Sequence, residues 1–482
     1  MPVKILLLAL IFASSPAAFS SSNGGNLPKL GDSVSGVISL EQERKLGQEF
    51  LRSLRAQAPT VSDPLLKNYL EHLVYRLAAH SQLEDKRLDT VIIDDPRINA
   101  FAVPGGVIGI NKGLFMNAET EHEVAAILAH ELAHLSQRHF ARRIQADRKS
   151  SITSMAGLLA GILLMATAGG EAGMAAMTTA QAAAQNQALS YNRSREAEAD
   201  RIGIDTLADA DMDPRAMAYM FERLDRANRY AGDQVPEFLR THPVTRSRIA
   251  DSYNQSRNYE RKQYPTDLDY QLMRNRVLVM SAESPSSAVN RMKVGLDQPD
   301  LVKQAASRYG LVLALTEKQE TDEALRHLRM LEDEYPGKIA FILAKADIHV
   351  EAKRYEQALE ILKDAVETNP DNYPLTMAYA RTLLKADQPK EAEPLLVNLT
   401  RKRENDQDIW YLLAETYGLA NNIVGVHQAR AEYFVLNGNF DQAIKQLGYA
   451  LPLVEGNFQS SARIRQRIEE IHELREEREQ RG

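Results

Sequence analysis

Apolar residues recur every three to four positions along most of this chain, which is the spacing of amphipathic helices. The spacing predicts helix between residues 40 and 80, from Glu119 to about Asp147, from about Asn192 to Ala210, and from Leu268 to about Ala282. The second of these segments has one apolar stripe, made of Val124, Ile127, Leu128, Leu132 and Leu135. The chain is therefore expected to be mostly helical.

A short stretch between the first two helical segments has a different pattern. Thr90–Asp94 and Gly106–Ile110 are β-branched runs. Turn residues bound them, namely Asp95-Pro96 and Pro104-Gly105-Gly106. Short runs of this kind predict two or three strands of a small sheet.

The C-terminal part of the chain is periodic. Ala324, Ala358 and Ala392 lie 34 residues apart, and Pro336 and Pro370 repeat the same step. This is the period of tetratricopeptide repeats, in which each unit is a pair of helices and stacked units form a concave surface. A plain helical bundle is the alternative, and the repetition of both alanine and proline argues against it. The pattern becomes irregular after Ala392.

Composition and the N-terminus indicate an exported globular protein. The chain has 482 residues, 44% of them hydrophobic and 26% charged, with a net charge of −7, which does not favour nucleic-acid binding. Lys4, the apolar run Ile5–Ala13 and Ala18-Phe19-Ser20 are typical of a signal peptide cleaved near Ser20. An uncleaved membrane anchor is the alternative, but the run is shorter than the ~20 residues that a spanning helix needs. The chain has no cysteine, and with such a signal this is consistent with the periplasm.

One helical segment carries a metal-binding motif. His130-Glu131-Leu132-Ala133-His134 is HExxH, which places two imidazoles one turn apart on one helix face with a carboxylate beside them. The histidines are the expected ligands of one Zn²⁺ per chain, and Glu131 is the expected general base of peptide hydrolysis.

A catalytic zinc site normally has three protein ligands, so a third is expected downstream. Glu196 and Asp200 lie four residues apart and share a helix face in the sequence Ser194–Asp200. Glu196 is the candidate ligand, and Asp200 is expected to accept a hydrogen bond from a ligand imidazole. Glu198 points elsewhere on this helix. His139 is expected to have a structural hydrogen-bonding role.

The two motifs together, HELAH and SREAEADRIG, resemble those of gluzincin peptidases of the CAAX-prenyl-protease type. The likeness also includes Asn99–Ala102, Gly105-Gly106 and Thr241-His242-Pro243. It implies that Glu196 is the third zinc ligand. The whole layout is similar to that of bacterial periplasmic members of the family that act on outer-membrane β-barrel proteins. It implies unfolded or misassembled outer-membrane proteins as clients, contact with the β-barrel assembly machinery through the repeats, and at most a peripheral association with the membrane.

His242 has three interpretations at this stage. It stabilises the oxyanion of the transition state, or it binds the zinc and closes its open position at rest, or it caps the next helix. Arg246 follows one turn later and is expected to support His242 or the substrate. A peptide substrate is expected to add a strand beside Asn99, Ala100 and Phe101.

The Ala/Gly/Met-rich segment 155–180 is expected to form a helical hairpin, either simply buried or acting as a mobile lid over an apolar strand. The GGE sequence at 169–171 interrupts it before it reaches a membrane-spanning length.

The expected fold class is α+β, mostly α, with a gluzincin metallopeptidase domain containing a small sheet, followed by an all-α tetratricopeptide superhelix. The expected divisions are 1–20 signal peptide, 21–265 metallopeptidase domain, 266–300 connecting helices and 301–482 repeats. The expected function is a periplasmic zinc metalloendopeptidase that degrades misassembled outer-membrane β-barrel proteins and also assists their assembly. The alternative is a chaperone or adaptor whose zinc site is latched or structural.

Overall fold

The structure is a computed structural model that describes residues 38–146, 160–163, 185–230 and 236–479. The predicted signal peptide, 1–20, lies outside these residues, and so does most of the predicted hairpin 155–180. Within the described residues, no helix is both long enough and apolar enough to cross a bilayer. The chain is mostly helical with one small sheet, as expected from its pattern of apolar residues.

Three short strands form the sheet, in the order β1-β3-β2. The central strand β3 is parallel to β1 and antiparallel to β2. Gly109 of β3 lies opposite Phe101 of β2, and the Phe101 ring fills the space that a side chain at Gly109 would occupy. Strand β2 is thus one edge of the sheet. The strands are β1 (Asp89–Ile93), β2 (Ala100–Val103) and β3 (Val107–Asn111).

Helix α4 is central to the peptidase part and packs against α2, α8, α9 and β2. Its N-cap Thr120 accepts a hydrogen bond from the Glu123 amide, which satisfies one of the free donors of the first turn. Almost all of its side chains are buried because other elements cover it on several sides. The helices of this part are α1 (Leu40–Gln57), α2 (Pro64–His80), α3 (Lys112–Asn117), α4 (Glu121–Ser136), α5 (His139–Ala146), α8 (Gln185–Asp209), α9 (Ala216–Tyr230), α10 (Glu237–Thr241) and α11 (Arg246–Ser256).

Two of the expected helical segments are each divided in two. The segment 40–80 is interrupted between α1 and α2, where Asp63 caps α2 and Pro64 is its first residue. The segment 119–147 is interrupted at Arg138, whose φ of 47° is left-handed. Apolar spacing continues through both breaks, so it could not locate them.

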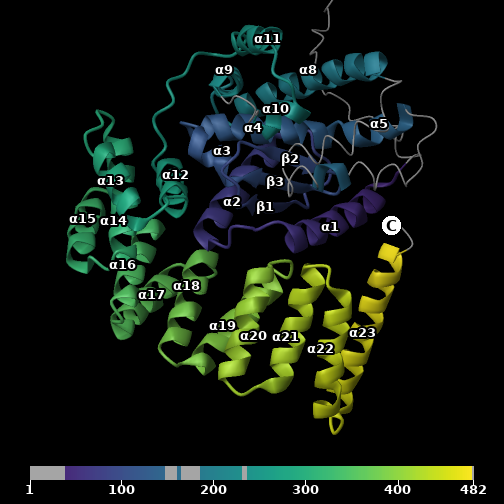
Figure 1. Cartoon of the computed structure of the whole chain (residues 1–482), viewed down its shortest axis with the longest axis vertical. Helices are drawn as coiled ribbons and strands as arrows, with labels where there is room; N and C mark the ends of the chain where they lie inside the picture. Colours follow the sequence, from purple (N-terminus) through teal and green to yellow (C-terminus); the bar gives the residue numbers. More distant parts are fainter. Residues whose placement is uncertain (1–37, 147–159, 164–184, 231–235, 480–482) are drawn as a thin grey trace, which may run out of the picture.

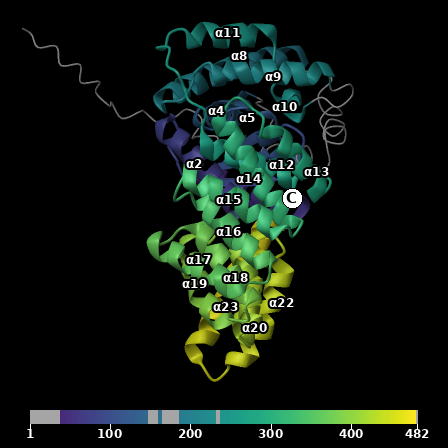
Figure 2. The ribbon, with the colours of Figure 1, turned by 90° about the vertical axis from the view of Figure 1, so that its left-hand side faces the viewer.

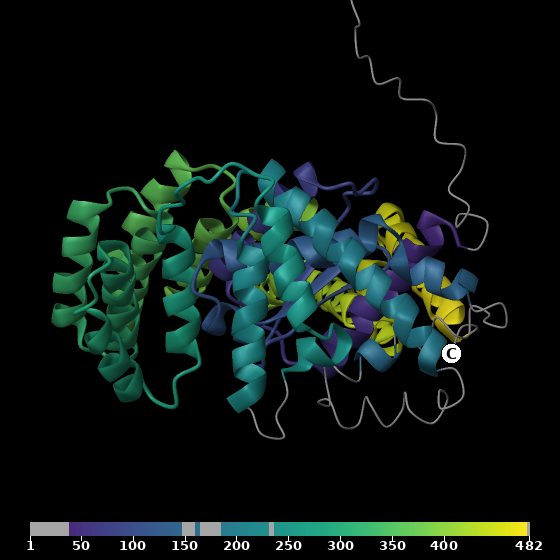
Figure 3. The same cartoon turned by 90° about the horizontal axis from the view of Figure 1, so that it is seen from above.

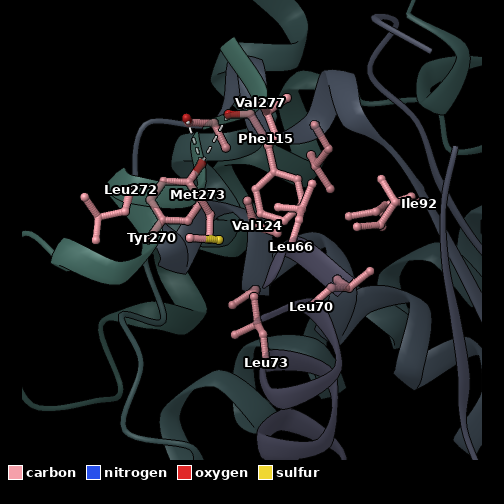
Figure 4. Packing of buried hydrophobic residues seen from close by; sticks show 14 of the residues in the cluster. Leu66, Leu70, Leu73, Ile92, Phe115, Val124, Tyr270, Leu272, Met273 and Val277 are labelled. Atoms are coloured by element: carbon pink, nitrogen blue, oxygen red, sulfur yellow. Dashed lines mark hydrogen bonds between the residues drawn. The ribbon is translucent and has the colours of Figure 1, made fainter. Parts of the chain in front are cut away.

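Helix α12 joins the peptidase part to the repeats through a packed core (Figure 4). The buried Tyr270 stacks on Phe115, and its hydroxyl donates to the Ala118 carbonyl at 2.9 Å. Figure 4 shows Leu66, Leu70 and Leu73 of α2 around the same cluster. The connection is therefore a packed joint. Its two helices are α12 (Leu268–Met280) and α13 (Pro285–Gly295).

The repeat region is a curved stack of helix pairs (Figure 1). The periodic residues Ala324, Ala358 and Ala392 are fully buried where paired helices meet, because an alanine permits close approach. The stack continues past α19 in the same way, because α21 packs against both α20 and α22 just as α17 packs against both α16 and α18. The helices are α14 (Leu301–Glu317), α15 (Thr321–Glu334), α16 (Ile339–Glu351), α17 (Tyr355–Thr368), α18 (Tyr373–Lys385), α19 (Pro389–Lys402), α20 (Gln407–Leu419), α21 (Ile423–Leu436), α22 (Phe440–Ala450), the 3₁₀ turn η1 (Leu451–Val454) and α23 (Phe458–Glu479).

The repeat stack curves back beneath the peptidase part (Figures 1 and 2). Seen from above, its first helices project to one side and its last helices lie under α1 (Figure 3). Polar contacts fix this arrangement: Lys67 of α2 bonds Asp406 at 2.9 Å, and Lys45 of α1 bonds Glu477 of α23 at 2.9 Å. The repeats therefore contact the peptidase part along much of their length.

Candidate metal centre

The two histidines of the HExxH motif face the same point from adjacent turns of α4. His130 Nε2 and His134 Nε2 are 3.0 Å apart. His130 is completely buried, whereas His134 is partly exposed. The spacing of four residues places both rings on one helix face, as the sequence predicts.

Helix α8 brings a carboxylate to the two histidines. Glu196 lies 3.5 Å from His130 Nε2 and 3.6 Å from His134 Nε2. The glycine at 203 favours the close approach of α8 to α4, because a Cβ there would make a tight contact of 3.2 Å with the His130 amide nitrogen. A small residue seven positions after Glu196 thus sets the depth of the carboxylate in the site.

Asp200 lies behind His130, four residues after Glu196. Its Oδ1 is 2.9 Å from His130 Nδ1, so the opposite ring nitrogen faces Glu196. Arg248 of α11 holds Asp200 with two hydrogen bonds of 2.7 Å, and it also contacts Glu196 at 3.2 Å. One buried arginine therefore aligns both carboxylates.

His242 brings a third imidazole to the cluster from the end of α10. Its Nδ1 is 3.0 Å from Glu196 Oε2 and 3.3 Å from His130 Nε2. Its ring stacks on Phe238, and its amide donates to the Phe238 carbonyl at 2.8 Å, which fixes the residue at the helix end. The ring position is therefore set by packing as well as by polar contacts.

Glu131 lies beside the ligand cluster and close to the edge of the sheet. Its Oε2 accepts a hydrogen bond from the Ala102 amide of β2 at 2.9 Å, and its Oε1 is 3.5 Å from His242 Nε2. Oε1 is buried and accepts no hydrogen bond within the described residues. Burial raises the pKa of this carboxyl above its ordinary value, which makes the ionised form a stronger base.

The charges of the cluster are arranged for cation binding. Burial alone would raise the pKa of Glu196, but His242 and His130 lower it well below its ordinary value. Burial also lowers the pKa of His134 far below its usual range, so this ring is neutral at neutral pH. Burial opposes protonation of His130, yet hydrogen bonds to Asp200 and Glu196 raise its pKa to about 9. A bound cation would replace that proton.

The donor set fits zinc. One ligand atom from each of His130, His134, Glu196 and His242 lies within 4.8 Å of the other three. Imidazole nitrogens and a carboxylate oxygen are ordinary zinc ligands, and four of them match its preferred coordination number. Binding of a cation would also offset the Glu196 charge, which the buried rings and Arg248 now neutralise.

The residues expected to contact a substrate are placed differently from one another. Asn99 and Ala100 are buried at the start of β2, and the Asn99 carbonyl accepts from the Asn111 amide at 3.0 Å. The Phe101 side chain packs on Phe50 in the core behind the sheet, with ring centroids 5.7 Å apart. Because its backbone is also paired to Gly109, Phe101 has a packing role, which does not support the expected substrate contact.

The sequence suggested Arg246 as the arginine that supports the site, but in the structure Arg248 has this position. Arg246 is exposed at the start of α11, and Arg248, two residues later, is the buried arginine that reaches the site. The two differ by about 200° around the helix, and the local sequence does not reveal which face is buried. His139, by contrast, has the hydrogen-bonding position that was expected: its Nδ1 is 2.9 Å from His134 Nδ1.

The fold and the site together define a metallopeptidase of the HExxH class that carries C-terminal helical repeats. Peptidase family M48 matches residues 64–254, which include all four residues of the cluster, and a tetratricopeptide repeat family matches residues 349–416.

Whole-chain relatives make the assignment more specific. The β-barrel assembly-enhancing protease of Escherichia coli (strain K12) is 33% identical over 476 residues, which cover 98% of this chain and 96% of the relative. A putative β-barrel assembly-enhancing protease of Vibrio cholerae serotype O1 is 34% identical over 98% of both chains. The mitochondrial metalloendopeptidase OMA1 of Schizosaccharomyces pombe is 29% identical over 44% of this chain and 60% of its own length. The chain belongs to the family of β-barrel assembly-enhancing proteases.

Proposed function

We propose that this metallopeptidase is an exported zinc endopeptidase of the periplasm that degrades misassembled outer-membrane β-barrel proteins and also assists their assembly. The observation that carries the enzymatic part is Glu131, a buried carboxylate whose Oε1 accepts no hydrogen bond among the described residues, beside four convergent ligand atoms. The full-length similarity to β-barrel assembly-enhancing proteases supports the client class and the compartment.

We infer that His130, His134 and Glu196 hold one zinc ion per chain. Bound zinc acts as a Lewis acid and lowers the pKa of water from about 15.7 to about 7. Asp200 fixes the His130 ring through Nδ1, so that Nε2 is the ligand atom. Glu131 accepts the proton of the attacking water at Oε1, because Oε2 is already bonded to the Ala102 amide. The same carboxyl then delivers the proton to the leaving amine.

The free edge of β2 is suited to hold a substrate in extended form. The Asn99–Asn111 hydrogen bond faces β3, and the alternation of antiparallel pairing then turns the amides and carbonyls of Ala100 and Ala102 away from β3. The Ala102 amide already reaches Glu131 on that side. A peptide that pairs with this edge would pass the proposed general base. In this arrangement Asn99 and Ala100 would contact the substrate through their backbone groups and not through their side chains.

His242 supports a latched resting state. A zinc ion held by three ligands keeps its fourth position open for water and substrate. His242 Nδ1 lies within hydrogen-bonding distance of Glu196 and is close to His130, which supports the interpretation of His242 as a fourth ligand. We infer that His242 closes the site at rest and must move aside before a peptide binds.

A chaperone or adaptor is the second candidate function, and it also follows from the position of His242 beside the other ligands. If His242 remained a permanent ligand, the site would be structural, and the chain would act as a chaperone or adaptor through its repeats. The buried Glu131 Oε1, which accepts no hydrogen bond among the described residues, favours the enzyme, because a structural site needs no general base. In both cases the repeats are proposed to hold outer-membrane proteins or their assembly machinery.

The client class is tested with an outer-membrane β-barrel protein in two states. The zinc-loaded chain is incubated with the barrel protein diluted from denaturant, or with the same protein folded in detergent micelles. We expect cleavage of the unfolded form only, and none with Glu131→Gln. Cleavage of both forms at equal rates would contradict the proposed preference, whereas cleavage of neither, with casein still degraded, would remove the client class and keep the peptidase.

A further inference from the structure

The chain turns sharply at the end of α4, immediately after the second histidine of the motif. Arg138 has a φ of 47°, a left-handed conformation that is costly for a residue with a side chain. Its guanidinium donates to Glu43 at 2.9 Å and to the Ile38 carbonyl at 2.6 Å, which holds the turn in place. The turn starts α5 at His139 and brings that ring back onto His134.

His139 lies between a metal-facing histidine and an acidic residue of α8. Its Nδ1 is 2.9 Å from His134 Nδ1, and its Nε2 is 3.1 Å from Glu198 Oε2. The His139 side chain is buried, whereas Glu198 is partly exposed and also contacts Arg142 at 3.4 Å. The three side chains form a continuous line from the ligand cluster to the surface.

When His134 binds a metal, only one arrangement of protons allows both the His134–His139 and the His139–Glu198 hydrogen bonds to form. His134 Nε2 faces the other ligands and needs its lone pair, so its proton is on Nδ1. That proton is donated to His139 Nδ1, which must then be unprotonated. The His139 proton is therefore on Nε2 and is donated to Glu198, which has acceptor oxygens only.

We propose that His139 and Glu198 are positioning residues that fix the tautomer and ring orientation of the metal ligand His134. The inference rests on the proposed zinc site. It assigns His134 a support of a different kind from that of His130, which a carboxylate contacts directly. For His134 a neutral imidazole is placed between ligand and carboxylate, because Glu198 is two residues after Glu196 and points to another side of α8, where it contacts His139.

The role proposed for Glu198 is indirect. By helix geometry it points away from Glu196 and is not a ligand, as the sequence predicts. It nevertheless reaches a ligand through His139, so its removal is expected to affect the metal. Asp205 is on the same helix but accepts hydrogen bonds from Tyr259 and Gln255, so Asp205→Asn is a suitable control for Glu198→Gln.

The test measures zinc affinity by competition with a chelator, in full-length protein carrying Glu131→Gln to prevent proteolysis. Outer-sphere partners of metal ligands typically contribute 10- to 100-fold in affinity. We expect His139→Leu to weaken zinc binding within this range. His139→Asn, whose oxygen can take the place of Nδ1 as acceptor, should restore most of it. Glu198→Gln should weaken binding by about tenfold, and Asp205→Asn should leave it unchanged.

Thermal unfolding of the metal-free proteins separates positioning from stability. If His139 positions His134, zinc should raise the melting temperature less in His139→Leu than in the parent. Equal zinc affinity in His139→Leu and the parent would overturn the proposal, and so would equal losses in His139→Leu and His139→Asn. If His139→Leu does not fold, equal affinities in Glu198→Gln and Asp205→Asn would overturn it. A parent that binds no zinc would instead overturn the proposed metal site.

Discussion

His242 contacts both the ligand cluster and the general base with one ring. Its Nδ1 is 3.0 Å from Glu196, and its Nε2 is 3.5 Å from Glu131 Oε1. While this ring is in place, it occupies the space between the ligands and the base where water and a peptide carbonyl must enter. Its removal therefore has opposite consequences for a latch and for a transition-state donor.

We predict that His242→Ala degrades an unfolded substrate faster than the parent at saturating zinc, and that it cleaves itself. The reason is that loss of a fourth ligand opens the metal to water. The measurement is the rate of casein degradation, with zinc content determined for each sample. A fall of about 10²–10³ with zinc retained would assign His242 as an oxyanion donor, and an unchanged rate would leave it as a helix cap. The double variant Glu131→Gln/His242→Ala must be inactive.

At the residue scale, motif chemistry was predictable from the sequence, but the supporting contacts were not. HExxH and the i, i+4 pair Glu196 and Asp200 are local patterns, and helix geometry alone puts each pair on one face. Arg248 and the line His139–Glu198 depend on which faces of α11 and α5 turn inward. That is decided by packing against distant elements, so neighbouring residues give no signal.

The geometry of the site depends on how closely α8 approaches α4. Gly203 lies at the contact, where an added Cβ would meet the Met217 side chain at 3.0 Å as well as the α4 backbone. Glu196 and Asp200 are on the same helix two turns and one turn earlier. A change in the distance between the helices therefore moves both carboxylates relative to the histidines.

We predict that Gly203→Val lowers zinc affinity and destabilises the fold by about 1–3 kcal/mol, the usual cost of overpacking. Gly448→Ala in α22 is the control, because nothing lies within 4 Å of the Cβ that it adds. Alanine there should stabilise the protein by about 0.5–1 kcal/mol, since glycine is a poor helix former. Urea unfolding and chelator competition measure the two effects. Unchanged zinc affinity in Gly203→Val would show that the depth of α8 does not set the site.

At the element scale, the type of most elements followed from apolar spacing, while their ends did not. Strands β1 and β3 were located because β-branched runs were bounded by turn residues, whereas β2 was not predicted from such a run. The break at Arg138 was missed because a left-handed arginine is held by Glu43 and Ile38, about 100 residues earlier in the chain. A long-range contact of this kind has no local signature.

The repeat stack is joined to the peptidase part by buried charges. Lys67 of α2 bonds Asp406, the N-cap of α20, at 2.9 Å, and Asp408, in the first turn of α20, at 3.0 Å. Arg403 bonds Glu71 of α2 and lies over the Tyr373 ring at 4.0 Å. The 34-residue period predicted the stack itself, but the return of the stack onto α2 depends on these distant charge pairs, so it could not be predicted.

We predict that this junction loses stability in acid. Burial alone would raise the pKa of Asp406, but Lys67 lowers it to about 2. A carboxyl whose pKa is lowered on folding stabilises the fold above its unfolded pKa of about 3.9. That contribution, about 2–3 kcal/mol, is lost as the pH falls from about 4 to 2.

Metal-free Asp406→Asn should therefore be less stable than the parent at pH 6 by about 2–3 kcal/mol, and the difference should shrink towards pH 2. Urea unfolding at both pH values measures it. Asp441→Asn, at an exposed pair with Arg475, should change stability by less than about 0.5 kcal/mol at either pH. A difference that stays constant with pH would contradict the role given to the Lys67–Asp406 pair.

The most direct test of the account compares zinc content and casein degradation in the purified chain and in Glu131→Gln. In the proposed mechanism Glu131 is the base and not a ligand, so its replacement should remove proteolysis and leave one zinc per chain. The account predicts an active parent, an inactive variant and equal zinc in both. Equal activity in the two proteins would contradict the hydrolytic mechanism, and a variant without zinc would contradict the separation of base from ligands.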